Sequence, residues 1–378
     1  MNYTYWLEPG AIDHLGQVLD ELKAESVLLV ADADAYRLSG AQETLRGTFA
    51  PRRIVSFTGF EPNPDFHDLQ RGLDTLRGSP CDVALAIGGG TAIDLAKLIS
   101  TLAVQRGSAL QIIQGQSTIQ RDGVPLIAVP TTAGTGSEAT RNAVVYLDGQ
   151  KYSPEHEFLL PQYAIVDPQL TYSLPPHITA SSGLDALAQA VESMWSVGST
   201  KDSRSWAAKA LGLAMTHLED AVKHPGPESR RAMCEAAHLA GKAINVSRTT
   251  APHAISYTLT SRFNVPHGCA VALTLGSILV YNSKVMDSDC TDPRGPGHVR
   301  RTVREIVGLL GCSTPEQANE RITALVSTIR CPIRLRDVGV GGQREITFLV
   351  DQVNTQRLAN NPRQITPATL RNLLERLS

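Results

Sequence analysis

Five β-rich runs separated by helical patterns fill the chain up to about residue 175, and this alternation constrains the fold most strongly. The runs are SVLLVADAD, RRIVSFTG, DVALAIGGG, PLIAVPTT and YAIVDP. Alternation of this kind predicts a parallel sheet covered by helices. After Ala180 the β signal fades, and segments such as GLDALAQAVESMWS repeat apolar residues at helical spacing. We therefore expect an α/β domain over residues 1–176 and an all-α domain over residues 177–378, joined near Pro175 and Pro176.

Length and charge exclude several classes of protein. A chain of 378 residues exceeds the size at which one core usually stops growing, which also favours two domains. Lys plus Arg number 35 against 37 Asp plus Glu, so no global field attracts nucleic acid or an anionic membrane. The amino terminus lacks a signal-peptide pattern, and no apolar run approaches the ~20 residues of a spanning helix. The six cysteines lack CxxC spacing and suit reduced packing residues. These features predict a cytoplasmic enzyme.

Two glycine-rich loops follow predicted strands and resemble phosphate-binding turns. In DVALAIGGGTAIDLAK, a buried strand leads into Gly88, Gly89 and Gly90 and then into a helix near Thr91. Glycines let the backbone approach an anion, and a helix start offers N–H groups to it, although such a loop can also be only a tight turn. VPTTAGTGSEAT repeats the arrangement after the next strand. Upstream, Asp32 ends the strand SVLLVAD, where a carboxylate can bind a ribose 2′-OH or act only as a cap.

A second motif, GLDALAQAVES, brings metal-binding residue types onto a helix. Asp185 and Gln189 are four residues apart and share one helix face. His253 lies in a later helical stretch, and His267 follows a proline. Two imidazoles and a carboxylate together would suit Zn²⁺ or Fe²⁺, but histidines at such spacing can equally be packing residues.

Seven segments resemble the iron-dependent, or group III, alcohol dehydrogenases, in the same order along nearly the whole chain. They are EPNPD, GGGTAIDLAK, PTTAGTGSEAT, AIVDP, GLDALAQAVE, PHAISYTLTSRFNVPHG and NNPR. The resemblance implies an amino-terminal dinucleotide-binding α/β domain, a helical metal- and substrate-binding domain, and NAD(P) and a divalent metal in a cleft between them. The carboxylate Asp32 favours NAD(H) over NADP(H), because it would repel a 2′-phosphate.

The resemblance also assigns residues to the two ligands. The metal-binding aspartate of the family falls on Asp185 and two of its histidines on His253 and His267. Its remaining ligand, a histidine, is replaced by Gln189, whose amide is a weaker ligand for Fe²⁺ or Zn²⁺. A further histidine near the nicotinamide is replaced by Tyr257, which becomes a candidate proton donor. The expected cofactor-binding residues are Asp32, Gly88, Gly89, Gly90, Thr91, Asp94, Thr131, Thr132, Gly136, Ser137 and Lys151.

Basic and hydroxyl side chains cluster in sequence around these predicted ligands. Arginine binds anionic groups through two parallel hydrogen bonds, which points to a small anionic aldehyde or alcohol as substrate, although such cations often lie on solvated faces. The predicted substrate-binding residues are Arg141, Lys242, Arg248, Thr249, Thr250, Ser256 and Arg262. Within the family the resemblance is strongest to the phosphonoacetaldehyde reductase branch, which acts in phosphonate and phosphinate natural-product biosynthesis. This predicts metal-dependent reduction of phosphonoacetaldehyde to 2-hydroxyethylphosphonate, with no nucleic-acid or membrane partner.

Two alternatives stay open, and the sequence also allows a homodimer. A dehydroquinate synthase-like lyase shares the architecture and also uses NAD and metal, but it shows no net change in NADH. A dinucleotide-binding protein whose metal site has decayed at Gln189 would hold no stoichiometric metal.

Overall fold

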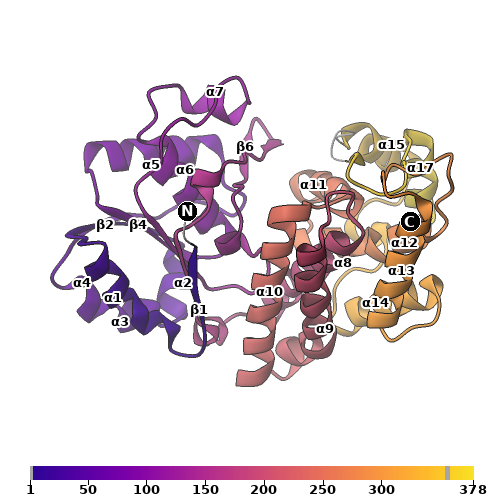
Figure 1. The fold of residues 1–378 in the computed structure, drawn as a ribbon, viewed down its shortest axis with the longest axis horizontal. Helices are drawn as coiled ribbons and strands as arrows, with labels where there is room; N and C mark the ends of the chain where they lie inside the picture. The colour runs from indigo at the N-terminus through magenta and orange to yellow at the C-terminus, as the bar shows by residue number, and fades with distance from the viewer. Residues whose placement is uncertain (1–2, 354–357) are drawn as a thin grey trace. The chain divides into compact units, whose positions relative to one another are not determined.

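The computed structural model describes residues 3–353 and 358–378 and divides the chain into two compact units, Met1–Leu174 and Pro175–Ser378. Figure 1 shows sheet and helices together in the first unit and helices in the second. Among the described residues, no helix combines the length and apolarity needed to cross a membrane.

The first unit contains a six-stranded parallel sheet with the order β1-β8-β5-β4-β2-β3. The predicted runs form β2, β3, β4, β5 and β8, which confirms the α/β prediction, whereas the edge strand β1 was not predicted. The elements are β1 (Thr4–Leu7), η1 (Ala11–Asp13), α1 (His14–Glu21), β2 (Ser26–Ala31), α2 (Ala33–Leu38), α3 (Ala41–Thr44), α4 (Arg46–Phe49), β3 (Arg53–Phe57), α5 (Phe66–Gly78), β4 (Val83–Gly88), α6 (Gly90–Leu102), α7 (Ala109–Ile113), β5 (Leu126–Pro130), η2 (Ser137–Ala139), the hairpin β6 (Val145–Leu147) and β7 (Gln150–Tyr152), η3 (Glu157–Leu159), β8 (Tyr163–Val166) and η4 (Pro168–Thr171).

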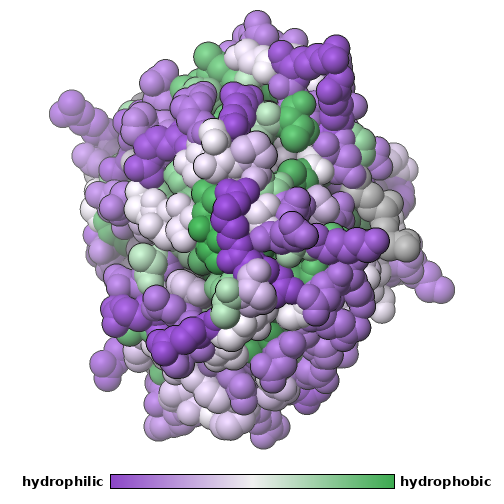
Figure 2. Space-filling view, turned by 90° about the vertical axis from the view of Figure 1, so that its left-hand side faces the viewer, coloured by the Kyte–Doolittle hydropathy of each residue, from purple (hydrophilic) through white to green (hydrophobic). Residues whose placement is uncertain are grey.

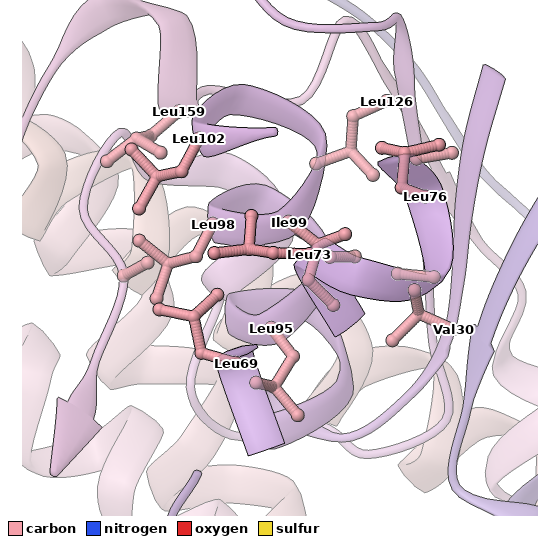
Figure 3. Close-up of a cluster of buried hydrophobic side chains, with 14 of the residues drawn as sticks. Val30, Leu69, Leu73, Leu76, Leu95, Leu98, Ile99, Leu102, Leu126 and Leu159 are labelled. Carbon is pink, nitrogen blue, oxygen red and sulfur yellow. The ribbon is translucent and has the colours of Figure 1, made fainter. Parts of the chain in front are cut away.

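Helices cover both faces of this sheet, so β2 and β4 are buried along their whole length. Leucines of α5 and α6 pack on one face against Val30 and Leu126, as Figure 3 shows. The other face is covered by α1 and α3, and Figure 1 shows the two sets of helices on opposite sides of the strands. Gly72 allows α5 to approach α6 closely, because a Cβ there would lie 2.2 Å from Cδ1 of Ile99. The packing holds α6 firmly against the sheet, and α6 begins at the glycine-rich loop.

The second unit is built around α8, which is buried at every position from Gly183 to Trp195. This helix packs against α9, α10 and α12, which Figure 1 shows on its two sides. A helix buried all round normally carries apolar residues, yet Asp185, Gln189 and Glu192 are among its buried side chains. The elements are α8 (Pro176–Trp195), α9 (Lys201–Lys223), α10 (Pro227–Ser247), α11 (Ala251–Phe263), α12 (His267–Ser283), α13 (Pro296–Leu309), α14 (Pro315–Thr328), η5 (Leu335–Val338), α15 (Gln343–Gln352) and α17 (Pro367–Glu375).

The face of the molecule in Figure 2 is mostly hydrophilic, and its hydrophobic residues form small separate groups. Scattered apolar residues of this kind are ordinary on a protein surface. The buried polar residues of the interior are therefore the more informative feature.

Candidate active site

Three predicted metal ligands bring their donor atoms together in the second unit. Oδ1 of Asp185 lies 3.1 Å from Nε2 of His253 and 4.0 Å from Nε2 of His267. All three donor atoms lie within 4.8 Å of one another. Donors that surround a metal tetrahedrally at about 2.1 Å are roughly 3.4 Å apart. The trio therefore fits a Zn²⁺ or Fe²⁺ ion in both chemistry and spacing.

A close approach of two helices places these ligands. His267 is the first residue of α12, and the next residue is Gly268. A Cβ at Gly268 would lie 1.8 Å from the carbonyl oxygen of Ser181 and 2.8 Å from the amide nitrogen of Asp185, both in α8. Since only glycine lacks a Cβ, this residue lets the start of α12 contact the backbone of α8 beside Asp185.

Glu192 supports the site from behind His253, and sequence reasoning missed it. One carboxylate oxygen, Oε2, makes a short hydrogen bond with Nδ1 of His253. The other, Oε1, accepts hydrogen bonds from the backbone nitrogen and the hydroxyl of Thr250, each 2.9 Å long. Trp195 donates from Nε1 to the same hydroxyl at 2.8 Å. A carboxylate on one ring nitrogen fixes the imidazole and leaves the other nitrogen for a metal.

Electrostatics mark this cluster as rich in negative charge. Burial lowers the pKa of His253, but Glu192 and Asp185 outweigh it and raise the pKa to about 10. Burial raises the pKa of Asp185, but hydrogen bonds and charge from its two histidine neighbours and Gln189 bring it below the ordinary value. With both imidazoles neutral, the two buried carboxylates would carry two negative charges, which a divalent cation would neutralise.

Two predicted departures from the family pattern lie beside these ligands. The Gln189 side chain is 3% exposed and hydrogen-bonds with Asp185. The ring of Tyr257 stacks on the ring of His267, with centroids 6.0 Å apart and planes 9° apart. Gln189 as a fourth ligand and Tyr257 as a proton donor stay predictions, and both side chains contact the predicted ligands.

The predicted cofactor residues gather at one edge of the sheet in the first unit. Asp32 follows β2, Gly88 ends β4 and Thr131 follows β5, and these three strands are neighbours. The chain order reverses between β2 and β4, where open α/β sheets bind their ligands. A Cβ at Gly88 would lie 3.5 Å from Cβ of Asp32, which shows how close the two loops lie. Oδ1 of Asp32 also caps α2 by accepting from the nitrogen of Ala35 at 2.8 Å.

The two glycine-rich loops contact each other. A Cβ at Gly89 would lie 3.4 Å from Cγ2 of Thr132, and one at Gly90 would lie 2.8 Å from Cγ2 of Thr135. These glycines therefore let the two loops pack closely, and their contact with an anion stays a prediction. Gly136 adopts a left-handed conformation with φ of 59°, which suits glycine.

Asp94 and Ser137, which we expected at the cofactor, are part of a buried network with Lys97. Nζ of Lys97 donates to the hydroxyls of Ser137 and Thr140 at 2.9 Å each and to the carbonyl of Asn142 at 2.8 Å. The hydroxyl of Ser137 donates to Oδ1 of Asp94 at 2.5 Å. The network ties α6 to the second loop. The side chains of Asp94 and Ser137 thus have partners inside the protein.

The remaining predicted cofactor residues differ in position. Oγ1 of Thr91 accepts from the backbone nitrogen of Asn63 at 3.3 Å. Thr131 is 1% exposed and Lys151 lies in the hairpin strand β7. Their contacts with a dinucleotide stay predictions.

The predicted substrate cations are distributed over several elements. Arg141 lies in the first unit and pairs with Glu155, with Nη2 and Oε1 2.9 Å apart. Nζ of Lys242 lies 4.7 Å from the ring centroid of Trp206. Arg262 lies in the last turn of α11, whereas His253 lies in its first turn. Arg248 follows the end of α10 and precedes α11, so it lies nearest in sequence to the ligand His253.

Three predicted hydroxyl residues lie in α11 or just before it. The hydroxyl of Thr250 binds Glu192, and that of Ser256 donates to the carbonyl of His253 at 2.8 Å. Both groups are therefore engaged within the protein. The carbonyl of Thr249 accepts from Nδ2 of Asn360 at 2.9 Å, which anchors the backbone beside Arg248.

Known proteins match the whole chain. The family description "Iron-containing alcohol dehydrogenase" matches residues 2–168, and "Fe-containing alcohol dehydrogenase family, C-terminal" matches residues 179–378. Phosphonoacetaldehyde reductase of Streptomyces viridochromogenes is 35% identical over 86% of this chain and 85% of its own length. Long-chain-alcohol dehydrogenase 1 of Geobacillus thermodenitrificans is 30% identical over 97% of this chain and 93% of its own.

A solved structure agrees with the family match. Sulfoacetaldehyde reductase from Bifidobacterium kashiwanohense, in complex with NAD⁺, has a TM-score of 0.89 and 30% identity, and covers 100% of this chain and 96% of its own. The α/β unit and the helical unit thus agree with both comparisons. The chain belongs to the iron-containing alcohol dehydrogenase family.

Proposed function

We propose that this chain is an NAD(H)-dependent, metal-assisted reductase of a small anionic aldehyde, with phosphonoacetaldehyde as the first candidate. The observation that carries the proposal is the convergence of Asp185, His253 and His267, with Glu192 behind His253. A divalent ion held there would act as a Lewis acid on a carbonyl group. A decayed site would have no reason to keep a buried carboxylate on the far nitrogen of a ligand histidine.

The chain's own residues divide the remaining tasks. The ends of β2, β4 and β5 would bind the dinucleotide, with the start of α6 at the pyrophosphate and Asp32 at the ribose. Tyr257 would supply a proton from beside His267, since its ring stacks on the imidazole. The burial of Asp185 and His253 would keep water from the ligands.

The anionic group of the substrate is proposed to bind Arg248. This residue has φ of 59°, a conformation rare for residues other than glycine, and the backbone on either side of it is anchored. The carbonyl of Ser247 accepts from the hydroxyl of Ser196 at 2.6 Å, and that of Thr249 accepts from Asn360. Strained backbone that the surrounding structure fixes is common at binding sites. Two similar proteins are named for aldehydes with phosphonate and sulfonate groups, which supports an anionic substrate.

The test is a kinetic comparison of charged and neutral aldehydes. Purified protein loaded with Fe²⁺ or Zn²⁺ is assayed for NADH and NADPH oxidation with phosphonoacetaldehyde, sulfoacetaldehyde and propanal. We expect NADH and an anionic aldehyde to be preferred. Arg248→Ala should lower kcat/KM for the anionic substrate by roughly thirty- to several-thousand-fold, and Arg248→Lys should recover part of the loss.

Propanal turnover serves as the internal control for Arg248→Ala and should change little. Equal losses on charged and neutral aldehydes would assign Arg248 to the fold instead of the substrate. Preference for NADPH would remove the proposed role of Asp32. A protein that retains no metal and oxidises neither cofactor would instead be the non-catalytic alternative.

A further inference from the structure

Two cysteines of the second unit lie in direct contact close to the metal-ligand cluster. The sulfurs of Cys269 and Cys331 are 3.2 Å apart. Cys269 lies in the first turn of α12, two residues after His267, and Cys331 follows α14. All six cysteines are in the reduced form. Since a disulfide bond is about 2.05 Å long, the two sulfurs must move about 1 Å closer to form one.

The surroundings of Cys269 connect it to the metal ligands on both helices. Its sulfur hydrogen-bonds with the side chain of Ser181, which lies one turn before Asp185 in α8. Its neighbour Gly268 is the residue whose missing Cβ lets α12 contact the backbone of α8. A shift of Cys269 along this contact therefore changes the separation between His267 and Asp185. Metal sites tolerate only about 0.2 Å in ligand distance.

We propose that Cys269 and Cys331 form a reversible disulfide that weakens metal binding. Hydrogen peroxide is the oxidant. One thiolate sulfur attacks a peroxide oxygen and the O–O bond breaks. The products of this step are a sulfenic acid on that cysteine and one molecule of water. The second sulfur then attacks the first, the S–O bond breaks and a second water leaves, so that the two sulfurs lose two electrons and both thiol protons end in water. A dithiol reductant restores the thiols. Disulfide formation stands on the sulfur contact alone, whereas its effect on the metal rests on the proposed function.

The first measurement is the mass and thiol content of the zinc-loaded protein after peroxide treatment. Zinc is chosen because it is not redox-active. The wild-type protein should lose two of its six alkylatable thiols and two hydrogens in mass, and peptide mapping should link Cys269 with Cys331. Cys331→Ser should form no such link, and Cys312→Ser, a change outside the pair, should still form it. A wild-type protein that keeps six thiols, or links other cysteines, overturns the proposal.

The second measurement is the zinc dissociation constant, determined by chelator competition before oxidation, after oxidation and after reduction with dithiothreitol. Oxidation should weaken zinc binding by about tenfold or more in the wild type and in Cys312→Ser. Binding should recover on reduction, and Cys331→Ser should not respond. A linked protein with unchanged zinc affinity would overturn the regulatory role while leaving the proposed function intact. A protein that binds no zinc in any state would instead refute the proposed function.

Discussion

The two units each bury a cluster of charged side chains, and the clusters differ in how they balance charge. In the first unit, Lys97 and Asp94 are opposite charges with Nζ and Oδ1 3.7 Å apart, and three oxygens accept from the ammonium group. In the second unit, two carboxylates face the single ring of His253. In the first cluster, hydrogen bonds to neutral oxygens satisfy the ammonium group. The second has negative charge in excess, which is typical of a site that takes a cation from outside.

The direction of the pKa shifts expresses the same difference. Burial lowers the pKa of Lys97 to about 8, although Asp94 partly opposes it. Burial also lowers the pKa of His253, yet there the carboxylates prevail and raise it to about 10. Both groups are fully buried and two carboxylates act on each, but only His253 hydrogen-bonds with both of its carboxylates, whereas the short hydrogen bonds of Lys97 go to neutral oxygens. Two buried carboxylates on one imidazole are thus the more informative indicator of a cation site.

Removal of a metal ligand should give the largest effect. His267→Ala and His253→Ala should each lose bound metal and lower kcat/KM by on the order of a thousandfold, because a metal supplies several kcal/mol of charge stabilisation. Plasma mass spectrometry after dialysis against a weak chelator measures the metal. His298→Ala, a change in α13, is the control and should retain it. Full metal content in the ligand variants would show that the cluster is only a buried ionic group.

Lys97→Met should destabilise the first unit without changing metal content. Removing one partner of a buried pair typically costs about 3–5 kcal/mol in the free energy of unfolding. The effect should also depend on pH. The pKa of Lys97 is about 8 in the folded protein and 10.5 is its ordinary value. Between pH 8 and pH 10.5 the unfolded chain therefore keeps a proton on Lys97 that the folded protein has lost. The contribution of Lys97 to the free energy of unfolding of the wild-type protein thus rises with pH across that window.

Urea unfolding of both proteins at pH 7.5 and pH 10 tests this sign. The gap in unfolding free energy between wild type and Lys97→Met should widen at the higher pH. The control variant Lys223→Met removes an exposed ion pair with Glu219 and should lower the free energy of unfolding by about 0.5 kcal/mol at most. A gap that narrows as pH rises would mean that Lys97 is held charged more firmly in the fold than in the unfolded chain.

Glu192→Gln should weaken metal binding about 10- to 100-fold, since an amide keeps the shape but not the charge behind His253. Chelator competition measures the affinity, and thermal unfolding is recorded alongside it. Glu305→Gln, at an exposed pair with Arg204, is the matched control. Lower thermal stability with unchanged affinity would assign Glu192 to packing alone.

Gln189→His should have the smallest effect and the opposite sign. An imidazole is a stronger ligand than an amide, so zinc affinity should rise on the order of tenfold. The same chelator competition measures it, with Gln169→His in the first unit as the control. An unchanged affinity would indicate that the side chain at position 189 does not reach the metal.

The sequence predicted the core of the sheet better than its edges. Buried strands such as β2 and β4 are continuous apolar runs and were recognised, whereas β1 is a short, partly exposed strand at the sheet edge. Its pairing with β8 joins residues far apart in the chain, and no local pattern encodes that contact.

The candidate site was only partly predictable. The resemblance identified Asp185, His253 and His267, but Glu192 escaped attention although it lies seven residues after Asp185 on the same helix face. That spacing was a usable signal. The role of Lys97 was not recognisable, since its partners in the second loop come together only through the fold.

Gly268 limits which residues can be mutated to change the metal preference of the site. A side chain at this position would overlap the carbonyl of Ser181, so a mutant library that varies it would consist mainly of misfolded proteins. Positions 189 and 257 are better choices for randomisation, because they contact the ligands without setting the spacing between α8 and α12. Selectivity can thus be altered by side chains, whereas the backbone contact that makes the site possible has to stay fixed.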